Sequence, residues 1–508
     1  MMINFIDNFL NSITMYRLAL YYLIIIVVVS CFASFAGLVL YSSIDILISA
    51  FVLVSSCVIG NFLFSKIAGA VPNIESVFIT AFILLLILPI TFPADIPILI
   101  AASMIAMGSK YVFAIKRQHI FNPAALAAFS TGIIFNTGGG VWWVSAPVLL
   151  PIVIIGGLLL VRKIRRGQVV SFFLITYLIV STGISFFNQA SISDLLNTLN
   201  ILFVHSALLF FAFVMFTEPL TAPALPMQQR YYAVFTAILY ALPQVRNIGF
   251  IVTPELALII GNIFSYIISP KEKLILKLKD KKQLASGIYE FIFQKNSGFV
   301  FTPGQYMEWT LSHKKSDTRG NRRYFTIASS PTEDTIRLGI RLYEKPSSFK
   351  SSLIKMAHGE KIVAGGVAGD FVLPKDKDEK LVFVAGGIGI TPFRSMLKHL
   401  VDINEKRDIV LLSINKIEED IVYKDIFEEA EKKIGLKILY ILTEQSPTGW
   451  KGLAGHLSPE MVREHIADFK DRTFYISGSH IVVTSTKSVL NKIGIKKNRI
   501  KTDYFPGF

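Results

Sequence analysis

The chain has 508 residues, of which 52% are hydrophobic and 17% charged, and its formal net charge is +15. The first 270 residues hold only 11 Lys/Arg and 7 Asp/Glu, whereas the other 238 hold 40 and 29. This division excludes a uniformly soluble protein, and short basic clusters between apolar runs are typical of loops facing lipid headgroups rather than of a nucleic-acid surface.

Residues 1–17 lack the basic start and small-residue cleavage site of a secretory signal, so the first apolar run is expected to remain as an anchor. The only two cysteines, Cys31 and Cys57, lie in apolar runs, and the chain has no Cys-x-x-Cys pair. One chain therefore cannot hold an ordinary iron–sulfur cluster, although a cluster shared between subunits stays open. No metal site is predicted.

Apolar runs of spanning length predict a polytopic helical membrane domain over residues 1–270 with about ten spans. The runs lie near 17–40, 44–65, 77–92, 96–115, 121–136, 144–161, 168–187, 199–217, 230–245 and 249–269. The run at 77–92 is short and meets Pro93, and the run at 121–136 could be re-entrant.

Basic residues occur at every second boundary between these runs, with Arg246 as the exception. They are Lys66, Lys116-Arg117, the Arg162–Arg166 cluster, Arg230, and Lys271 with Lys273. Because cytoplasmic loops are enriched in Lys and Arg, the pattern predicts a protein of the cytoplasmic (inner) membrane with both termini cytoplasmic.

Three polar segments interrupt the apolar half and are candidates for a membrane site. Asn122 lies in Lys-Arg-Gln-His-Ile-Phe-Asn-Pro-Ala-Ala, Glu218 in Phe-Thr-Glu-Pro-Leu-Thr-Ala-Pro, and Glu255 in Thr-Pro-Glu-Leu-Ala-Leu-Ile-Ile-Gly-Asn. Polar groups are costly in lipid, and a helix starting at Pro123 could hold an anion. The alternatives are proline loops at the membrane edge and a carboxylate satisfied by a neighbouring helix.

In this order the three segments resemble landmarks of the flavin-bearing membrane subunits of the sodium-pumping NADH:quinone oxidoreductase and of the Rnf complex. The resemblance covers about residues 60–270 and implies an electron-carrying membrane domain, whether or not it moves cations. That family carries FMN covalently on the Thr of a Ser-Gly-Ala-Thr segment, which is missing here. The expected membrane cofactor is therefore non-covalent FMN or a quinone.

From Leu274 onward, alternating runs predict an antiparallel β-barrel over residues 271–377. The runs lead to Gln305-Tyr306 and then to Arg323-Tyr324-Phe325-Thr326. An Arg can bind flavin phosphates, an aromatic ring can pack on the isoalloxazine, and a hydroxyl can reach its polar edge. The pattern resembles the ferredoxin–NADP reductase superfamily, with Phe325 where that family usually has Tyr. The resemblance implies an FAD site with Thr326 nearest the incoming hydride.

Two further segments resemble the flavin site of that superfamily. The turn at 347–353, with Lys350, Ser351 and Ser352, matches its phosphate-holding turn, where backbone N–H groups at a helix start approach the pyrophosphate. The segment Gly-Val-Ala-Gly-Asp-Phe at 366–371 resembles its Gly-Pro-x-Gly-x-Phe turn.

A nicotinamide-binding α/β domain of the doubly wound kind is predicted over residues 378–508. An apolar strand runs into Gly386, Gly387 and Gly389, followed by a helix start at Thr391-Pro392, and glycines there allow a dinucleotide phosphate to approach the helix. Ser477-Gly478 resembles the superfamily's Cys-Gly-Pro turn near the nicotinamide. Of the C-terminal aromatics, Phe505 or Phe508 could shield the flavin, or the tail could simply pack.

The combined interpretation is a membrane NAD(P)H-dependent flavin oxidoreductase that passes electrons to a quinone, a flavin or an extracytoplasmic partner. Around residues 412–420 one Lys stands among three acids, which favours NADH over NADPH. A ferric-reductase-type enzyme with two haems is disfavoured, because only His119 and His205 occur in the apolar half. A transporter with a redox-sensing flavin domain is the other alternative.

Overall fold

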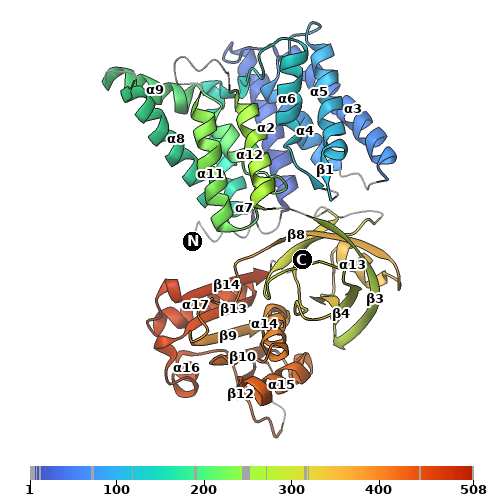
Figure 1. The fold of residues 1–508 in the computed structure, drawn as a ribbon, viewed down its shortest axis with the longest axis vertical. Coiled ribbons are helices and arrows are strands. Elements are labelled where there is room, and N and C mark those ends of the chain that lie inside the picture. Colours follow the sequence, from blue (N-terminus) through green and yellow to red (C-terminus); the bar gives the residue numbers. More distant parts are fainter. Residues whose placement is uncertain are drawn as a thin grey trace. The chain divides into compact units, whose positions relative to one another are not determined.

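The protein is described here by a computed structural model that covers residues 6, 9–10, 13–69, 74–116, 118–187, 192–242, 252–269, 272–313, 317, 320–444 and 448–505. The chain divides into two compact units, Met1–Lys273 and Leu274–Phe508 (Figure 1). The predicted boundary between a flavin and a nicotinamide domain, at residues 377 and 378, stays a prediction.

The first unit is almost entirely helical. Its helices are α2 (Met15–Phe35), α3 (Ser43–Ile67), α4 (Ile74–Ile87), α5 (Ile96–Val112), α6 (Pro123–Ile134), α7 (Leu150–Lys163), α8 (Gly167–Phe187), α9 (Ile192–Val204), α10 (Leu208–Phe210), α11 (Pro226–Ala241) and α12 (Pro254–Ile268). A π-helical turn, η3 (Phe211–Met215), continues α10, and a short hairpin of β1 (Ala114–Ile115) and β2 (Gln118–His119) follows α5.

The prediction of ten spans is wrong for the described residues, where three helices are long and apolar enough to cross a membrane: α2, α3 and α8. Proline and glycine break the other apolar runs. The run at 121–136, for example, gives only the 12 residues of α6, which starts at Pro123 and is followed by the glycines at 138–140. At about 1.5 Å per residue, such helices are shorter than a hydrocarbon core of about 30 Å. The orientation deduced from ten spans therefore loses its basis.

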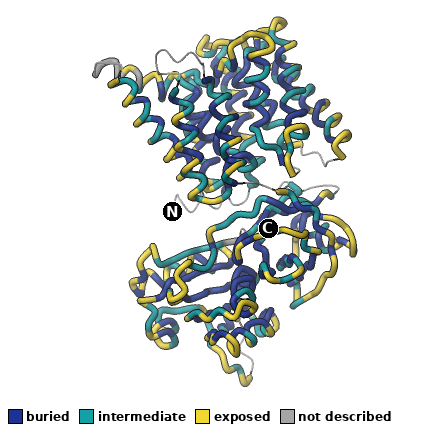
Figure 2. Tube along the Cα trace, in the orientation of Figure 1, coloured by how far each residue is buried: buried dark blue, intermediate teal, exposed yellow. Residues whose placement is uncertain are grey.

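The three long helices also have exposed residues, coloured yellow in Figure 2, and several of these residues are large and apolar. Phe35 is 82% exposed on α2, Phe51 is 74% exposed on α3, and Phe187 is 88% exposed on α8. Exposed apolar side chains of this size are unfavourable in water and suit a lipid environment.

The second unit begins with a six-stranded antiparallel sheet in the order β6-β5-β8-β3-β4-β7. Its strands are β3 (Lys273–Ala285), β4 (Ile288–Gln294), β5 (Tyr306–Thr310), β6 (Arg322–Thr326), β7 (Thr335–Arg341) and β8 (Lys361–Ala368), and α13 (Ser348–Lys355) packs on it. β6 and β7 stand at the two ends of this order. Just beyond β6, the Ala328 N–H donates to the carbonyl oxygen of Arg337 in β7 at 2.9 Å, so the two ends of the sheet approach each other.

The second sheet is parallel, in the order β12-β11-β10-β9-β13-β14. Its strands are β9 (Leu381–Gly386), β10 (Ile409–Asn415), β11 (Lys437–Leu442), β12 (Leu453–Ala454), β13 (Thr473–Ser479) and β14 (Ile500–Phe505). Helices α14 (Thr391–Asp402) and α15 (Lys424–Ile434) pack on one face, and α16 (Pro459–His465) and α17 (His480–Lys492) on the other. Both faces are covered, which explains the continuous apolar runs of β9 and β10.

Strand β9 lies between β10 on one side and β13 on the other. The strand order therefore reverses at β9. In open parallel sheets, ligands bind outside the carboxyl ends of the strands at such a switch point. The carboxyl end of β9 is Gly386.

Candidate functional site

A glycine turn occupies the switch point. Gly387 has a φ of +53°, a conformation that glycine adopts without strain. A Cβ on Gly389 would lie 2.3 Å from the carbonyl oxygen of Ser477, and one on Gly478 would lie 3.3 Å from Gly386. The predicted residues of the glycine turn and of β13 are thus in direct contact, and side chains there would separate them.

The helix α14 starts directly after this turn, with Thr391 and Pro392 in its first turn and both residues buried. The Thr391 hydroxyl donates to the carbonyl oxygen of Ile388 at 3.1 Å, which ties the helix to the turn. A helix N-terminus behind a glycine turn is a favourable position for a dinucleotide phosphate.

The predicted flavin motif lies on β6, at one end of the antiparallel sheet. Arg323 is 5% exposed, donates to the carbonyl oxygens of Gly320 and Arg322, and has Asp317 at 3.7 Å. Phe325 packs against Phe349 of α13, with their ring centroids 5.9 Å apart. The strand and α13 are therefore held together by an aromatic contact.

The predicted phosphate-holding turn forms the start of α13. Ser347 caps the helix by accepting from the Lys350 N–H at 3.3 Å, while Ser351 and Ser352 are half-buried within it. The Lys350 ammonium donates to the carbonyl oxygen of Arg341 at 3.0 Å. The turn thus contacts β7 as well as β6.

Two predicted residues earlier in the chain, Gln305 and Tyr306, have different environments. Gln305 is 9% exposed, and its side chain accepts from the Thr302 N–H at 2.8 Å, so it supports the loop that leads into β5. Tyr306 starts β5, pairs with Thr326 in the sheet, and stacks edge-on with Tyr324 at 5.9 Å. Tyr306 is therefore next to the hydroxyl that was predicted to face the flavin.

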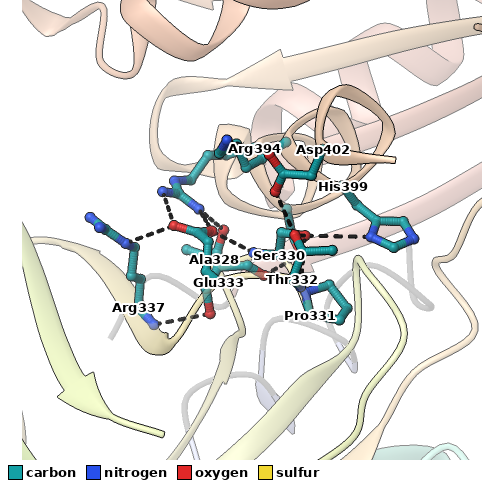
Figure 3. A network of polar contacts seen from close by, with 12 residues as sticks. Ala328, Ser330, Pro331, Thr332, Glu333, Arg337, Arg394, His399 and Asp402 are labelled. Carbon is teal, nitrogen blue, oxygen red and sulfur yellow. Dashed lines mark hydrogen bonds and ion pairs between the residues drawn. The ribbon is translucent and has the colours of Figure 1, made fainter. Parts of the chain in front are cut away.

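A buried ionic network joins the loop after β6 to helix α14 (Figure 3). Arg394 of α14 is 3% exposed and donates to both carboxylate oxygens of Glu333, at 2.6 and 3.0 Å. It also donates to the carbonyl oxygen of Ala328, just beyond the flavin motif, at 2.8 Å. Burial alone would raise the pKa of Glu333, but hydrogen bonds and charge from Arg394, helped by Ser330 N–H and Arg337, hold that pKa below its ordinary value.

Two buried hydroxyls supply a test of whether a cofactor fits. The Oγ1 of Thr326 and the Oγ of Ser477 are buried and have no hydrogen-bond partner among the described residues. Buried polar atoms are normally paired, so both atoms indicate a missing polar ligand. Thr326 was predicted to meet the flavin and Ser477 the nicotinamide, and the residues fit both groups.

In the helical unit, the three candidate segments meet, the third through its last residue, Asn262. The side-chain amide of Asn122 donates to Glu218 at 2.9 Å, and Thr221 donates to the same carboxylate at 3.2 Å. Asn262 of α12 accepts from the Asn122 N–H at 2.8 Å and donates to Tyr232 at 3.4 Å. Asn122, Glu218, Thr221, Tyr232 and Asn262 are called the amide cluster below.

Glu255 belongs to a different group. It is fully buried, and one oxygen accepts from the Gly140 N–H at 3.0 Å and from the Trp142 indole at 2.6 Å. It lies seven positions before Asn262 on α12, or about 10 Å along the helix axis. The structure thus brings Asn122 and Glu218 together but places Glu255 elsewhere.

The predicted C-terminal aromatic residues lie outside what the structure describes, and three residues of the site were not predicted. Phe508 lies beyond the described residues, as does the side chain of Phe505. Sequence reasoning missed Glu333, Arg394 and Gly339. The signal for Gly339 was a glycine in the middle of the alternating strand Thr335–Arg341.

Comparisons with known proteins agree with this geometry for the second unit. Residues 383–488 match the oxidoreductase NAD-binding domain family. The chain is 26% identical over 244 residues to NADH-cytochrome b5 reductase 1 of Aspergillus terreus, covering 46% of this chain and 82% of that protein. It is 24% identical over 241 residues to a flavohemoprotein of Oceanobacillus iheyensis, covering 46% of this chain and 58% of that protein.

A third relative is the glycine betaine monooxygenase reductase subunit of Pseudomonas aeruginosa, 27% identical over 211 residues, which are 41% of this chain and 57% of the relative. The chain thus spans less than two thirds of two of these three relatives. Among solved structures, Plasmodium falciparum ferredoxin-NADP+ reductase with 2'P-AMP is 21% identical, with a TM-score of 0.39, over 46% of this chain and 97% of that one.

The C-terminal half is therefore an NAD(P)H flavin oxidoreductase domain. The matched residues 383–488 lie within the second unit, so this match leaves the family of the helical unit open.

Proposed function

We propose that the protein is a membrane-anchored NADH oxidoreductase that transfers hydride to FAD in residues 274–508 and passes electrons to an acceptor in or at the membrane. The observation that carries this proposal is the glycine turn at the switch point, tied by Arg394 to the loop after the flavin motif. FAD supplies the chemistry, since it accepts a hydride and releases electrons singly.

The residues of this chain act by positioning the two cofactors. Arg323 and the start of α13 would hold the flavin phosphates, and Phe325 would pack on the flavin ring. The hydroxyl of Thr326 would bond the polar edge of the flavin, and Ser477 the nicotinamide. No acid or base is required for hydride transfer.

NADH is proposed over NADPH because of the charges that follow β10. Glu418 and Glu419 lie there, and the nearby Lys416 is paired with Glu444 at 2.6 Å. Carboxylates at this position suit a ribose hydroxyl and repel a 2′-phosphate. Comparing kcat/KM for the two cofactors tests the preference, and a higher value for NADPH would contradict it.

For the helical unit we propose an electron-acceptor site at the amide cluster, for a quinone or non-covalent FMN. The convergence of the three segments that resemble sodium-pumping NADH:quinone oxidoreductase and Rnf subunits, the third through Asn262, supports the proposal. Amide, hydroxyl and carboxylate groups inside an apolar unit are costly unless they serve a ligand or one another. An extracytoplasmic redox partner is an alternative final acceptor.

Because nicotinamide is a cytoplasmic cofactor, we also propose that residues 274–508 face the cytoplasm. Purified protein should be yellow and should lose its flavin absorbance when NADH is added without oxygen. A colourless preparation with intact protein would contradict the enzyme proposal. Inverted vesicles should oxidise added NADH, whereas sealed right-side-out vesicles should not.

A further inference from the structure

Strand β7 has two chemically distinct faces. Its even-numbered residues, Ile336, Leu338 and Ile340, are buried in the core of the antiparallel sheet. Its odd-numbered residues therefore face the other way, because side chains alternate along a strand. On that second face, Gly339 stands between Arg337 and Arg341.

Gly339 lies directly against the glycine turn and the first residue of α14. A Cβ built on Gly339 would lie 2.8 Å from Thr391 Cγ2, 3.0 Å from the Tyr423 hydroxyl and 3.4 Å from Ile388 Cδ1. Ile388 belongs to the glycine turn and Thr391 starts α14. Because Gly339 has no Cβ, β7 can approach the glycine turn this closely.

Ion pairs hold this contact on both sides of Gly339. Arg341 donates to Asp420, the 4%-exposed residue beyond β10, at 2.8 Å. Two positions earlier on β7, Arg337 reaches Glu290 at 2.6 Å and Glu333 at 3.0 Å.

Glu333 in turn binds Arg394 of α14 (Figure 3). Two arginines, Arg337 and Arg394, thus face two carboxylates, Glu290 and Glu333, and their formal charges balance. Such balance is needed for charges removed from water.

The same strand is also bonded to the flavin motif. Ala328 N–H donates to the Arg337 carbonyl oxygen at 2.9 Å, and Arg337 N–H donates to Ser329 Oγ at 3.2 Å. These residues follow Thr326 by two and three positions, so β7 is bonded through its edge to the segment after the flavin motif and contacts the glycine turn through its face. A shift of β7 would therefore change the distance between the two cofactor sites.

We propose that Gly339 is a positioning residue that sets the separation between the flavin and the nicotinamide. The inference rests on the proposed transfer of hydride from NADH to FAD. Hydride transfer needs reacting atoms about 3–3.5 Å apart, and a displacement of about 1 Å can cost a factor of about 100. An alanine methyl at Gly339 would meet Thr391 inside van der Waals contact and would push the turn away.

The experiment uses the full chain in detergent with bound FAD and compares wild type with Gly339→Ala. We expect the variant to keep its FAD and its NADH dissociation constant, while the rate of anaerobic flavin reduction at saturating NADH falls about 10- to 100-fold. The deuterium isotope effect with NADH labelled at C4 should rise towards its full value. Thr335→Ala, on the same strand away from the contact, is the matched control.

A second-site change tests the contact itself. Thr391→Ser keeps the hydroxyl but removes Cγ2, so Gly339→Ala/Thr391→Ser should recover part of the rate relative to Thr391→Ser alone. If Gly339→Ala does not fold, Asp420→Asn loosens the same contact through Arg341 and should slow flavin reduction with FAD retained. An unchanged rate, or a loss of FAD that explains the slower reduction, would overturn the inference. A wild-type protein whose bound FAD is not reduced by NADH would overturn the proposed function instead.

Discussion

Asn122 donates a hydrogen bond to Glu218 at 2.9 Å, although the two residues are 96 positions apart in the chain. The same asparagine caps α6 by accepting from the Ala125 N–H at 3.0 Å. One side chain therefore both fixes the start of a helix and orients a carboxylate inside an apolar unit. A group with two such bonds is rigid, which suits a binding site.

The first prediction concerns this amide cluster. We expect Glu218→Gln to slow reduction of a quinone acceptor about 10-fold or more. The glutamine amide has the size of the carboxylate but lacks its negative charge. Reduction of a soluble dye, which takes electrons from the flavin, should stay nearly unchanged. Glu255→Gln is the comparison, since Glu255 lies in a separate group. If Glu218→Gln lowers both activities equally, Glu218 has a structural role.

The second prediction concerns flavin binding. Arg323→Ala should weaken FAD about 10- to 100-fold, because a charge-assisted hydrogen bond of about 1.5–3 kcal/mol is lost. The flavin absorbance per mole of purified protein measures the occupancy. The neighbouring Arg322, which pairs with Glu308 at 3.4 Å, provides the control Arg322→Ala. Full occupancy in Arg323→Ala would remove this residue from the site.

The third prediction concerns the glycine turn. Gly389→Ala should abolish flavin reduction by NADH, because its Cβ would lie 2.3 Å from the backbone oxygen of Ser477 and backbone cannot easily yield. The FAD content should remain, since Gly389 lies on the nicotinamide side. Gly183→Ala, in a helix with no atom within 4 Å, is the control for adding a methyl group. Normal NADH oxidation by Gly389→Ala would contradict the assignment.

The fourth prediction concerns the membrane cofactor. No flavin should remain attached to this chain after denaturation, because the Ser-Gly-Ala-Thr segment is missing. Fluorescence of the denatured band in a gel measures covalent flavin. A fluorescent band whose flavin maps to a threonine, such as Thr131 or Thr137, would show that another segment accepts it.

The reductase half could be predicted more fully than the helical half for a physical reason. Glycines at 386, 387 and 389 and the motif at Arg323–Thr326 are short local patterns, and each is tied to a backbone geometry that few residues allow. Helix length is different, because apolar composition alone does not show where a helix ends. The run at 199–217 is apolar throughout much of its length, yet it contains the end of α9, α10 and a π-helical turn.

The contacts across the reductase unit could not be predicted in the same way. Arg394 and Glu333 are 61 residues apart, and neither belongs to a recognisable motif. Gly339 looks like a weak position in a strand until its neighbour Thr391 is known. Pairing of this kind depends on how two sheets pack, which no local pattern encodes.

The fifth prediction concerns pH and the Glu333–Arg394 pair. The pKa of Glu333 lies below its ordinary value in the folded protein, so its ionised form stabilises the fold. That contribution is complete above the unfolded pKa of about 4.3 and is lost as the pH falls through the lower folded pKa. The melting temperature of the wild type should therefore fall steeply as the pH is lowered from about 5 to 3.

Glu333→Gln removes this titration. We expect the variant to be destabilised at pH 7 by about 2–4 kcal/mol, because the buried Arg394 loses its nearest anionic partner and keeps only Glu290, at 4.0 Å. Its melting temperature should depend less on pH between about 5 and 3 than that of the wild type. Glu429→Gln, an exposed carboxylate paired with Lys433 at 2.6 Å, is the control and should cost at most about 1 kcal/mol. Parallel pH profiles for the wild type and Glu333→Gln would show that this pair does not contribute to acid stability.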